Sequence, residues 1–525
     1  MTTITLSLVS HTNVGKTTLA RTLLGRDVGE VRDAPHVTEF ADEFRLVESP
    51  SGHRLMLWDT PGFGDSVRLA RRMRQSPNPL SWLLGQVWDR WSDRAFWASQ
   101  QALRHVKDGS DVLLYLVNAG EPEAGWLHSE MQLLAWTGKP VLVLLNQLGV
   151  PRDAATERAE VEQWRERLAP WAQVRAVLSL DAFARCWVHE QVLLAAVQQA
   201  LGDDGERAAA LAELRTLWSA RLEAVFQQSA AELASSLSRV ALARESVPES
   251  GGGLTGRLRE WGARLVQPLQ PDGGDPAALA EQRLAAALEA EVRASTKRLL
   301  ALHGLAGGAG GTEASGTRTD DAASRILERV AAQVDQHRRV PEGRAAMLGG
   351  ALTGALAGLK ADVASGGLTL GGGLLAGGIL GALGAAGLAR GVNLVRGTGR
   401  TWVAWSAAAL PALTEAALLR YLAVAHYGRG RGEWADAEAP PHWPAAVAAA
   451  LQARSEAFDR LWKSRGERAA PLQDEARLAA ALQPLLIQTL RDVLAALYPG
   501  RADPPTDKRP TRDQTAEPGP DNART

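Results

Sequence analysis

The chain has little cysteine, little net charge and no leader-like opening. Cys186 is the single cysteine among 525 residues, which excludes an internal disulfide and fits a reducing compartment; we expect it to be a small buried apolar side chain. The formal net charge is −1, so attraction to nucleic acid or anionic lipid would need a local patch. We expect no signal peptide, because His11 and Lys16 closely follow the short apolar run 4–9. These features favour a cytoplasmic protein.

The first 203 residues alternate strand-like and helix-like patterns. The turn "PSG" between two strand patterns predicts a hairpin, and continuous apolar runs predict strands that are covered on both faces. The sequence therefore predicts an α/β P-loop NTPase domain over 1–203, with a mainly parallel six-stranded sheet and helices on both faces. The expected strands are 4–9, 38–49, 53–60, 111–119, 140–148 and 174–180, and the expected helices are 16–25, 92–107, 125–137, 153–168 and 187–201.

The strand signal stops after 202–207, where Ala, Leu, Arg and Glu begin to dominate. This composition, with helical periodicity, predicts a mostly α-helical domain over 204–498. The tail 499–525 has almost no apolar residues, so we predict that it is disordered. Helices are expected over 207–245, 276–303, 320–338, 401–427, 444–464 and 472–497.

The stretch "SHTNVGKT" fits the phosphate-loop pattern G-x-x-x-x-G-K-[ST], with Ser10 at the first glycine position. In this pattern a strand ends, the backbone N–H groups wrap the phosphates, and a helix begins with its positive end towards them. Lys16 would reach the outer phosphates and Thr17 would ligate Mg²⁺. The predicted phosphate-binding residues are Ser10, Asn13, Val14, Gly15, Lys16, Thr17 and Thr18.

A second phosphate element, "WDTPGFGD", follows the predicted strand 53–60. Asp59 would hold Mg²⁺ through water, and the Gly62 N–H would face a terminal phosphate. Two such elements at strand ends, in this order, are far more specific than either one alone.

Together "HTNVGKTTL" and "DTPG" resemble bacterial GTPases of the Era and TrmE-like class, over roughly residues 1–200. The chain is also similar to a bacterial group in which this domain precedes a C-terminal region of unknown function. The resemblance implies a switch loop whose threonine serves Mg²⁺ and the terminal phosphate. Thr38, the single threonine between Gly25 and Asp59, is the candidate for that role and for catalysis with Lys16; a surface strand threonine is the alternative.

Phe63 departs from Ras-like GTPases, which have a water-orienting glutamine at this place. The Era-like class shares such an apolar replacement. We therefore expect slow hydrolysis by the isolated chain, which a group supplied by a partner would accelerate by about 10³–10⁵-fold.

The base-reading motif also departs from the family, which reads guanine with N-K-x-D. The matching stretch is "NQLG", so Asn146 is kept and Gln147 replaces the lysine. The missing aspartate weakens base discrimination. Asp181, after the sixth strand, is a candidate substitute, and an exposed loop aspartate is the alternative. GTP is the expected nucleotide, while ATP or relaxed specificity stays open.

The stretch 66–97 combines tryptophans with four arginines, Arg68, Arg71, Arg72 and Arg74, that precede its two prolines. Leu80, Leu84, Val87, Trp88 and Trp91 recur at helical spacing. Such a segment could lie on a membrane surface or dock a partner. The alternative is that it packs against the chain's own helical domain.

Glycines recur at steps of four in 344–396, which predicts two helices joined by close packing along a glycine face. The first, 345–359, would be about 22 Å long, and the second, 368–389, would be about 33 Å long. Only the second helix would be long enough to cross the hydrocarbon core of a bilayer, which is about 30 Å thick. A membrane-inserted hairpin and a buried helix pair in water both stay open.

The sequence thus predicts a GTP-binding protein, a Mg²⁺-dependent GTPase switch with a helical domain. For that domain, a soluble state and association with the cytoplasmic (inner) membrane through 344–396 both stay open. A protein partner or activator is the other expected contact. Nucleic acid is not expected, because the C-terminal half lacks clustered Lys and Arg. The alternative is a nucleotide-dependent interaction module with little or no turnover. Oligomeric state does not follow from the sequence.

Overall fold

A computed structural model describes most of the two predicted domains. The described residues are 1–25, 42–85, 94–148, 152–181, 186–202, 205–246, 276–305, 388–392, 401–405, 407, 409–426, 440, 442–464 and 471–499.

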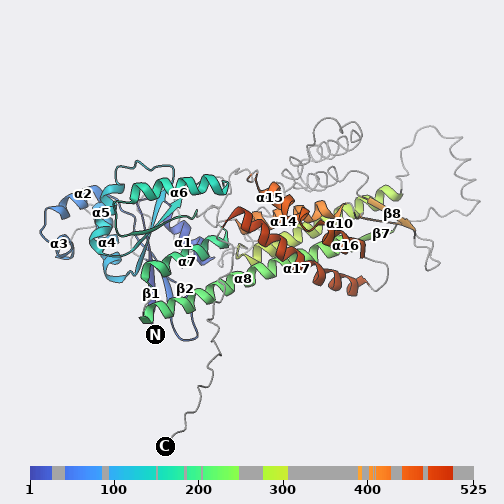
Figure 1. Cartoon of the computed structure of the whole chain (residues 1–525), viewed down its shortest axis with the longest axis horizontal. Coiled ribbons are helices and arrows are strands. Elements are labelled where there is room, and N and C mark those ends of the chain that lie inside the picture. The colour runs from blue at the N-terminus through green and yellow to red at the C-terminus, as the bar shows by residue number, and fades with distance from the viewer. Residues whose placement is uncertain are drawn as a thin grey trace, which may run out of the picture.

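The N-terminal region contains the predicted six-stranded sheet, in the order β2-β3-β1-β4-β5-β6 (Figure 1). All neighbouring strands pair in parallel except β2 and β3, which form the predicted antiparallel hairpin. The prediction of a mainly parallel sheet is confirmed. The strands are β1 (Thr3–Val9), β2 (Asp42–Glu48), β3 (Arg54–Asp59), β4 (Val112–Asn118), β5 (Val141–Asn146) and β6 (Val174–Ser179).

Helices cover both faces of this sheet, which explains the continuous apolar strands. Along β4, Leu113 and Tyr115 belong to one core, whereas Val112 and Leu114 belong to the other. Successive side chains of a strand point to opposite faces, so each face needs its own layer. The first layer is α2 (Ser66–Arg74), α3 (Pro79–Gly85), α4 (Arg94–Gly109), α5 (Leu127–Thr137) and α6 (Ala154–Leu168). The second is α1 (Lys16–Leu24), α7 (Trp187–Leu201) and the first part of α8 (Gly205–Leu242).

The described part of the arginine- and tryptophan-rich stretch packs within this first layer. Leu80 and Trp82 lie against the core formed with α4 and α5. The alternative that the tryptophans pack against the chain's own helical domain is therefore wrong for Trp82, whereas Trp88 and Trp91 lie outside the described residues. The guanidinium groups of Arg68 and Arg72 lie 4.5 and 4.9 Å from the centre of the Phe96 ring, so part of the basic character is used inside the domain.

The longest described helix, α8 (Gly205–Leu242), belongs to both halves of the molecule. Its 38 residues span about 57 Å at about 1.5 Å per residue. Leu211 and Trp218 pack in the second layer of the N-terminal region, whereas Phe226 and Leu233 pack in the helical core. Figure 1 shows the helix running from beside the sheet into the helical bundle, which makes it a continuous link between the two.

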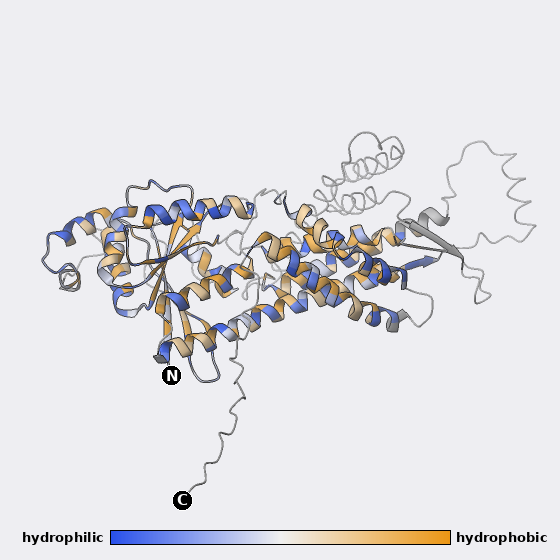
Figure 2. Cartoon of the chain, viewed as in Figure 1, coloured by the Kyte–Doolittle hydropathy of each residue, from blue (hydrophilic) through white to orange (hydrophobic). Residues whose placement is uncertain are grey.

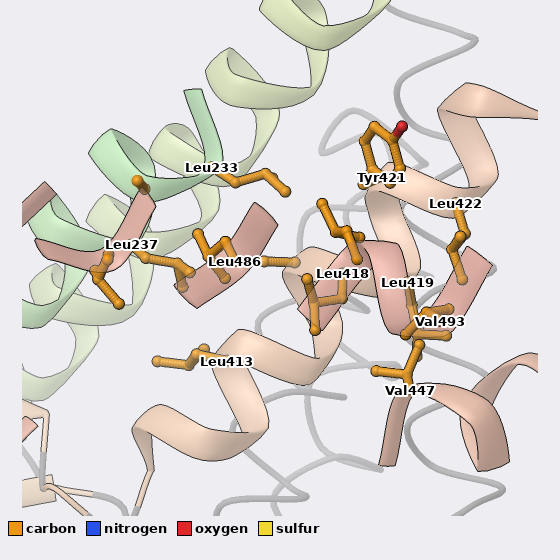
Figure 3. Packing of buried hydrophobic residues seen from close by; sticks show 14 of the residues in the cluster. Leu233, Leu237, Leu413, Leu418, Leu419, Tyr421, Leu422, Val447, Leu486 and Val493 are labelled. Carbon is orange, nitrogen blue, oxygen red and sulfur yellow. The ribbon is translucent and has the colours of Figure 1, made fainter. Parts of the chain in front are cut away.

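The helical core lies between α8 and five further helices. Leucines dominate it, and Figure 3 shows Leu237, Leu418 and Leu486 meeting from three of these helices. The helices of the bundle carry both hydrophobic and hydrophilic residues along their length (Figure 2), as amphipathic helices do. The five helices are α10 (Pro276–Leu302), α14 (Leu410–Ala425), α15 (His442–Gln452), α16 (Ser455–Ser464) and α17 (Pro471–Leu497).

A second, three-stranded sheet corrects the prediction of helices alone after residue 207. Its strands are β7 (Arg244–Ser246), β8 (Leu388–Val392) and β9 (Thr401–Trp405), and β9 pairs antiparallel with both others. Residues 401–405, "TWVAW", are β-branched or aromatic except for one alanine, so strand propensity prevails there.

Three predicted helices are corrected accordingly. The helix expected over 401–427 is a strand followed by α14, and that expected over 444–464 is two helices, α15 and α16. The helix expected over 368–389 cannot reach its predicted end, because β8 begins at Leu388.

Several predictions lie outside the described residues. These are the switch loop with Thr38, the helix 320–338, nearly all of the glycine-rich hairpin 344–396, and the tail after residue 499. Among the helices that the structure describes, none is both long and apolar enough to span a bilayer.

Candidate nucleotide site

The predicted nucleotide residues meet at one edge of the six-stranded sheet. The phosphate loop follows β1, the Asp59–Gly62 segment follows β3, Asn146 ends β5, and Asp181 follows β6. These strands are parallel, so their carboxyl ends share one edge, where open α/β sheets bind ligands. The sheet thus brings together residues that are far apart in the sequence. Thr38 lies outside the described residues.

The phosphate loop is shaped by two residues with left-handed backbone. Asn13 has φ 63° and Gly15 has φ 100°. A Cβ atom at Gly15 would lie 2.8 Å from Asn146 Nδ2, so both the conformation and the space require glycine. α1 begins at the next residue and has no side-chain cap, which directs its first N–H groups and positive dipole end at the loop.

Lys16 lies inside the loop with 8% of its surface exposed. Its Nζ donates to Ser10 Oγ at 3.0 Å and to the His11 carbonyl at 3.4 Å. Burial lowers the pKa of Lys16, and the negative charges of Asp59 and Glu130 oppose that shift. Within the described part of the chain its acceptors are uncharged oxygens, so an anionic phosphate would be a stronger partner. Ser10 therefore contributes a hydroxyl that a glycine would lack.

Thr17 and Asp59 form a candidate cation site beside Lys16. The Thr17 hydroxyl donates to Asp59 Oδ2 at 2.5 Å, and Asp59 is 1% exposed. Asp59 Oδ1 is buried without a hydrogen-bond partner among the described residues. Burial raises the pKa of Asp59 to about 6, although Lys16 and the Thr17 hydrogen bond lower it. A buried oxygen without a partner beside a hydroxyl fits a hard divalent cation.

The same described residues hold no cluster of three or more His, Cys, Asp or Glu side chains arranged for a metal. A cation at this site would therefore need ligands beyond the described acidic, histidine and cysteine side chains, and phosphate oxygens and water are the ligands that Mg²⁺ commonly has.

Gly62 and Phe63 bring the second phosphate element against the first. A Cβ atom at Gly62 would lie 3.0 Å from Lys16 Nζ and from Thr12 Cα, so the backbone approaches the loop closely. The Phe63 N–H donates to the Ser10 carbonyl at 2.9 Å, and the Thr12 N–H donates to the Phe63 carbonyl at 3.3 Å. The Phe63 ring is fully buried in the core that includes α2 and α5. The ring has no polar atom and thus cannot hydrogen-bond to water.

Two side chains join the end of β5 to the phosphate loop, and a third joins the ends of β5 and β6 to each other. Asn146 Nδ2 donates to the Val14 carbonyl at 2.7 Å, and Gln147 Nε2 donates to the Asn13 carbonyl at 3.4 Å. Asp181 Oδ2 accepts a hydrogen bond of 2.7 Å from the Leu148 N–H. Asp181 is 5% exposed, so the alternative of an exposed loop aspartate is wrong. The remaining predicted loop residue, Thr18, is buried in α1.

The sequence interpretation missed a polar cluster next to the loop. Glu130 on α5 is fully buried, and its Oε1 lies 2.8 Å from His11 Nδ1. The Tyr115 hydroxyl donates to Glu130 Oε2 at 2.7 Å. Burial raises the pKa of Glu130, and the His11 contact lowers it. The available signal was that Glu130 is the only acidic residue in the otherwise largely apolar stretch 127–137.

Comparisons with known proteins give one family match. Residues 5–147 match the family model described as 50S ribosome-binding GTPase, and this segment runs from within β1 to just after β5. No curated protein matches the chain.

Two solved structures of Era are similar at a low level. A variant of Era from Aquifex aeolicus bound to GDP·AlF4⁻ has 16% identity and a TM-score of 0.29. Era in complex with MgGDPNP and nucleotides 1506–1542 of 16S ribosomal RNA has 18% identity and a TM-score of 0.30. Each match covers 39% of this chain and 59% of the other. Similarity at this level carries no inference about substrate or partner.

Proposed function

We propose, from the P-loop GTPase domain that includes residues 5–147, that the chain is a Mg²⁺-dependent GTPase switch with a helical effector region. One observation carries the proposal beyond the family match. The Lys16 ammonium is buried against uncharged oxygens, and the buried Asp59 oxygen without a partner lies in the adjoining Thr17–Asp59 pair. A magnesium triphosphate would satisfy both groups at once.

In this proposal, Lys16 binds the outer phosphates, and the backbone N–H groups of Asn13 to Thr18 surround them. Thr17 ligates Mg²⁺ directly and Asp59 does so through water. Mg²⁺ would neutralise charge on the phosphate oxygens. Gly62 offers its N–H to the terminal phosphate, and Thr38 is proposed as the switch threonine.

The base would be read at the ends of β5 and β6. Asn146 and Gln147 both donate to phosphate-loop carbonyls, so they hold the base site against the phosphate site. Asp181, buried beside Leu148, is the proposed acidic group in place of the missing N-K-x-D aspartate. We propose a preference for GTP; equal or tighter binding of ATP would contradict it.

Hydrolysis by the isolated chain is proposed to be slow, because the buried Phe63 has no polar atom with which to orient water. The same observation favours the second candidate function, an interaction module with negligible turnover. An activating partner that supplies a polar group would distinguish the two, because only a competent site would respond to it.

The helical region is proposed as the part that reports the nucleotide state. α7 follows Asp181 after a short connection, and its first residues enter the helical core. Trp187 Nε1 donates to the Tyr421 hydroxyl at 3.2 Å, and the His189 and Tyr498 rings lie 4.8 Å apart. A shift at the base site would thus reach α14 and the residue that follows α17 through packed side chains.

Membrane association through 344–396, a protein activator and a cytoplasmic location stay predictions. No observation supports the expectation that excludes nucleic acid. One of the similar structures is a complex of Era with RNA, which is a statement about that protein. These partners are therefore open to direct measurement, by liposome flotation and by RNA binding.

Calorimetry with GTP and with ATP, each with Mg²⁺, tests the nucleotide proposal. Lys16→Ala should weaken GTP binding by about 100-fold or more, because a buried charge-assisted contact to phosphate is lost. Lys107→Ala, which removes an ammonium from α4, is the matched control and should bind as the parent chain does. No binding of any nucleoside triphosphate by the parent chain would refute the proposed function.

A further inference from the structure

Glu130 lies in a buried polar cluster to which the proposed nucleotide contacts give no role. Both of its carboxylate oxygens have partners, His11 Nδ1 and the Tyr115 hydroxyl. A carboxylate that is fully removed from water is costly unless it is paired and hydrogen-bonded. Glu130 is therefore held in one defined position, in the first turn of α5.

His11 connects this carboxylate to the phosphate loop. Its carbonyl accepts the 3.4 Å hydrogen bond from Lys16 Nζ. The residues on either side of His11 exchange backbone hydrogen bonds with Phe63, which directly follows Gly62. The His11 backbone thus lies between the lysine and the second phosphate element, and any shift of His11 would move both.

Trp126 restricts the His11 ring from another side. The two rings are stacked, with centres 4.6 Å apart and planes 4° from parallel. Trp126 directly precedes α5, and its carbonyl accepts the Glu130 N–H at 3.0 Å. A single helical turn therefore supplies both the stacking partner and the hydrogen-bond partner of His11.

The geometry points to Glu130 and His11 as a pair of positioning residues, which hold the phosphate loop against α5 in the shape that receives the triphosphate. This inference rests on the proposed function. Neither side chain is assigned to the nucleotide, so the pair acts through the loop backbone. Its loss should shorten the time for which nucleotide stays bound, because a loop that is no longer held can open.

Release of a fluorescent GDP analogue from the full-length chain, with thermal unfolding measured in parallel, tests this inference. Glu130→Ala and His11→Leu each remove the contact, and the double variant removes both partners. Glu130→Gln and His11→Asn keep a hydrogen-bonding group at the same place. His128→Leu is the matched control, since His128 is a histidine of the same helix that lies against Trp171.

We expect Glu130→Ala and His11→Leu each to speed release by about tenfold or more, because each variant removes the buried hydrogen bond that holds the loop. The double variant should be no faster than the faster single variant, because one shared contact is lost. Glu130→Gln and His11→Asn should stay within about threefold of the parent chain. His128→Leu should leave release unchanged.

Release rates like that of the parent chain for Glu130→Ala and His11→Leu would overturn the inference, as would independent effects that multiply in the double variant. Glu130→Gln as fast as Glu130→Ala would do the same. A parent chain that binds nucleotide while the variants show no effect contradicts this inference alone, whereas a parent chain that binds none removes the proposed function as well.

Discussion

Asp59 is a side chain whose burial disfavours folding but places a carboxylate at the candidate cation site. Its carboxylate is buried beside Lys16 and Thr17, and one oxygen has no hydrogen-bond partner among the described residues. Burial raises its pKa to about 6, which means that the nucleotide-free fold resists the charged form. Proteins often keep such unfavourable groups where function needs them.

Asp59→Asn should stabilise the nucleotide-free chain by about 1–3 kcal/mol at pH 7.5, because the buried charge is removed. An acid whose pKa is raised on folding lowers the stability of the fold at pH values above its folded-state pKa. This loss of stability vanishes at pH values below the pKa that the acid has in the unfolded chain. The gain should therefore be full above pH 6 and disappear towards pH 4. Thermal unfolding across this range measures it.

The same variant should lose most Mg²⁺-dependent GTP affinity, which calorimetry with and without Mg²⁺ would show. A variant that is no more stable than the parent chain at pH 7.5 would contradict the assigned burial cost. Unchanged Mg²⁺ dependence would contradict the proposed role of Asp59 at the cation.

At the scale of elements, the three-stranded sheet depends on β9. This strand lies between the other two, and Val403 pairs with Glu245 of β7 and Arg390 of β8. Residues that are far apart in the sequence are thereby joined at one end of the helical region (Figure 1).

Val403→Pro should destabilise the chain by about 2–3 kcal/mol, because proline cannot donate a ladder hydrogen bond in a central strand. Thermal or denaturant unfolding measures the change. Val403→Thr keeps a β-branched side chain and the backbone N–H, so it serves as the control and should be nearly neutral. Equal stability of the two variants would argue against the central position of β9.

At the scale of the molecule, two helices connect the nucleotide edge with the helical core. α8 packs in both cores, and α7 starts among helical-core residues such as Cys186 and Val188. Cys186 is fully buried there, as expected of a small apolar side chain. These shared residues give nucleotide binding a direct physical route to the helical region.

Hydrogen exchange with and without a non-hydrolysable GTP analogue tests this route. We expect exchange in 186–190 and 417–425 to slow by roughly twofold or more on binding, because ordering the base site stabilises the start of α7. Trp187→Phe removes the hydrogen bond to Tyr421 and should reduce the effect in α14 without changing nucleotide affinity. Protection confined to residues before 182 would contradict the coupling.

Local sequence patterns were enough to predict the six strands, most of their covering helices and the phosphate loop, although α2 was not predicted. Buried parallel strands need continuous apolar runs, and a phosphate loop needs fixed residue types at fixed spacing, so both leave a signal in neighbouring residues. The same patterns failed at 401–405, where five residues gave too short a window to separate strand from helix.

Tertiary structure alone decided which distant groups meet. His11 and Glu130 are 119 residues apart, and nothing in either segment identifies the other as its partner. Likewise, β7 has three residues and becomes a strand only by pairing with β9. Periodicity encodes which face of an element is apolar, but the partners of a buried polar group depend on how the faces pack, and this is settled only when the chain folds.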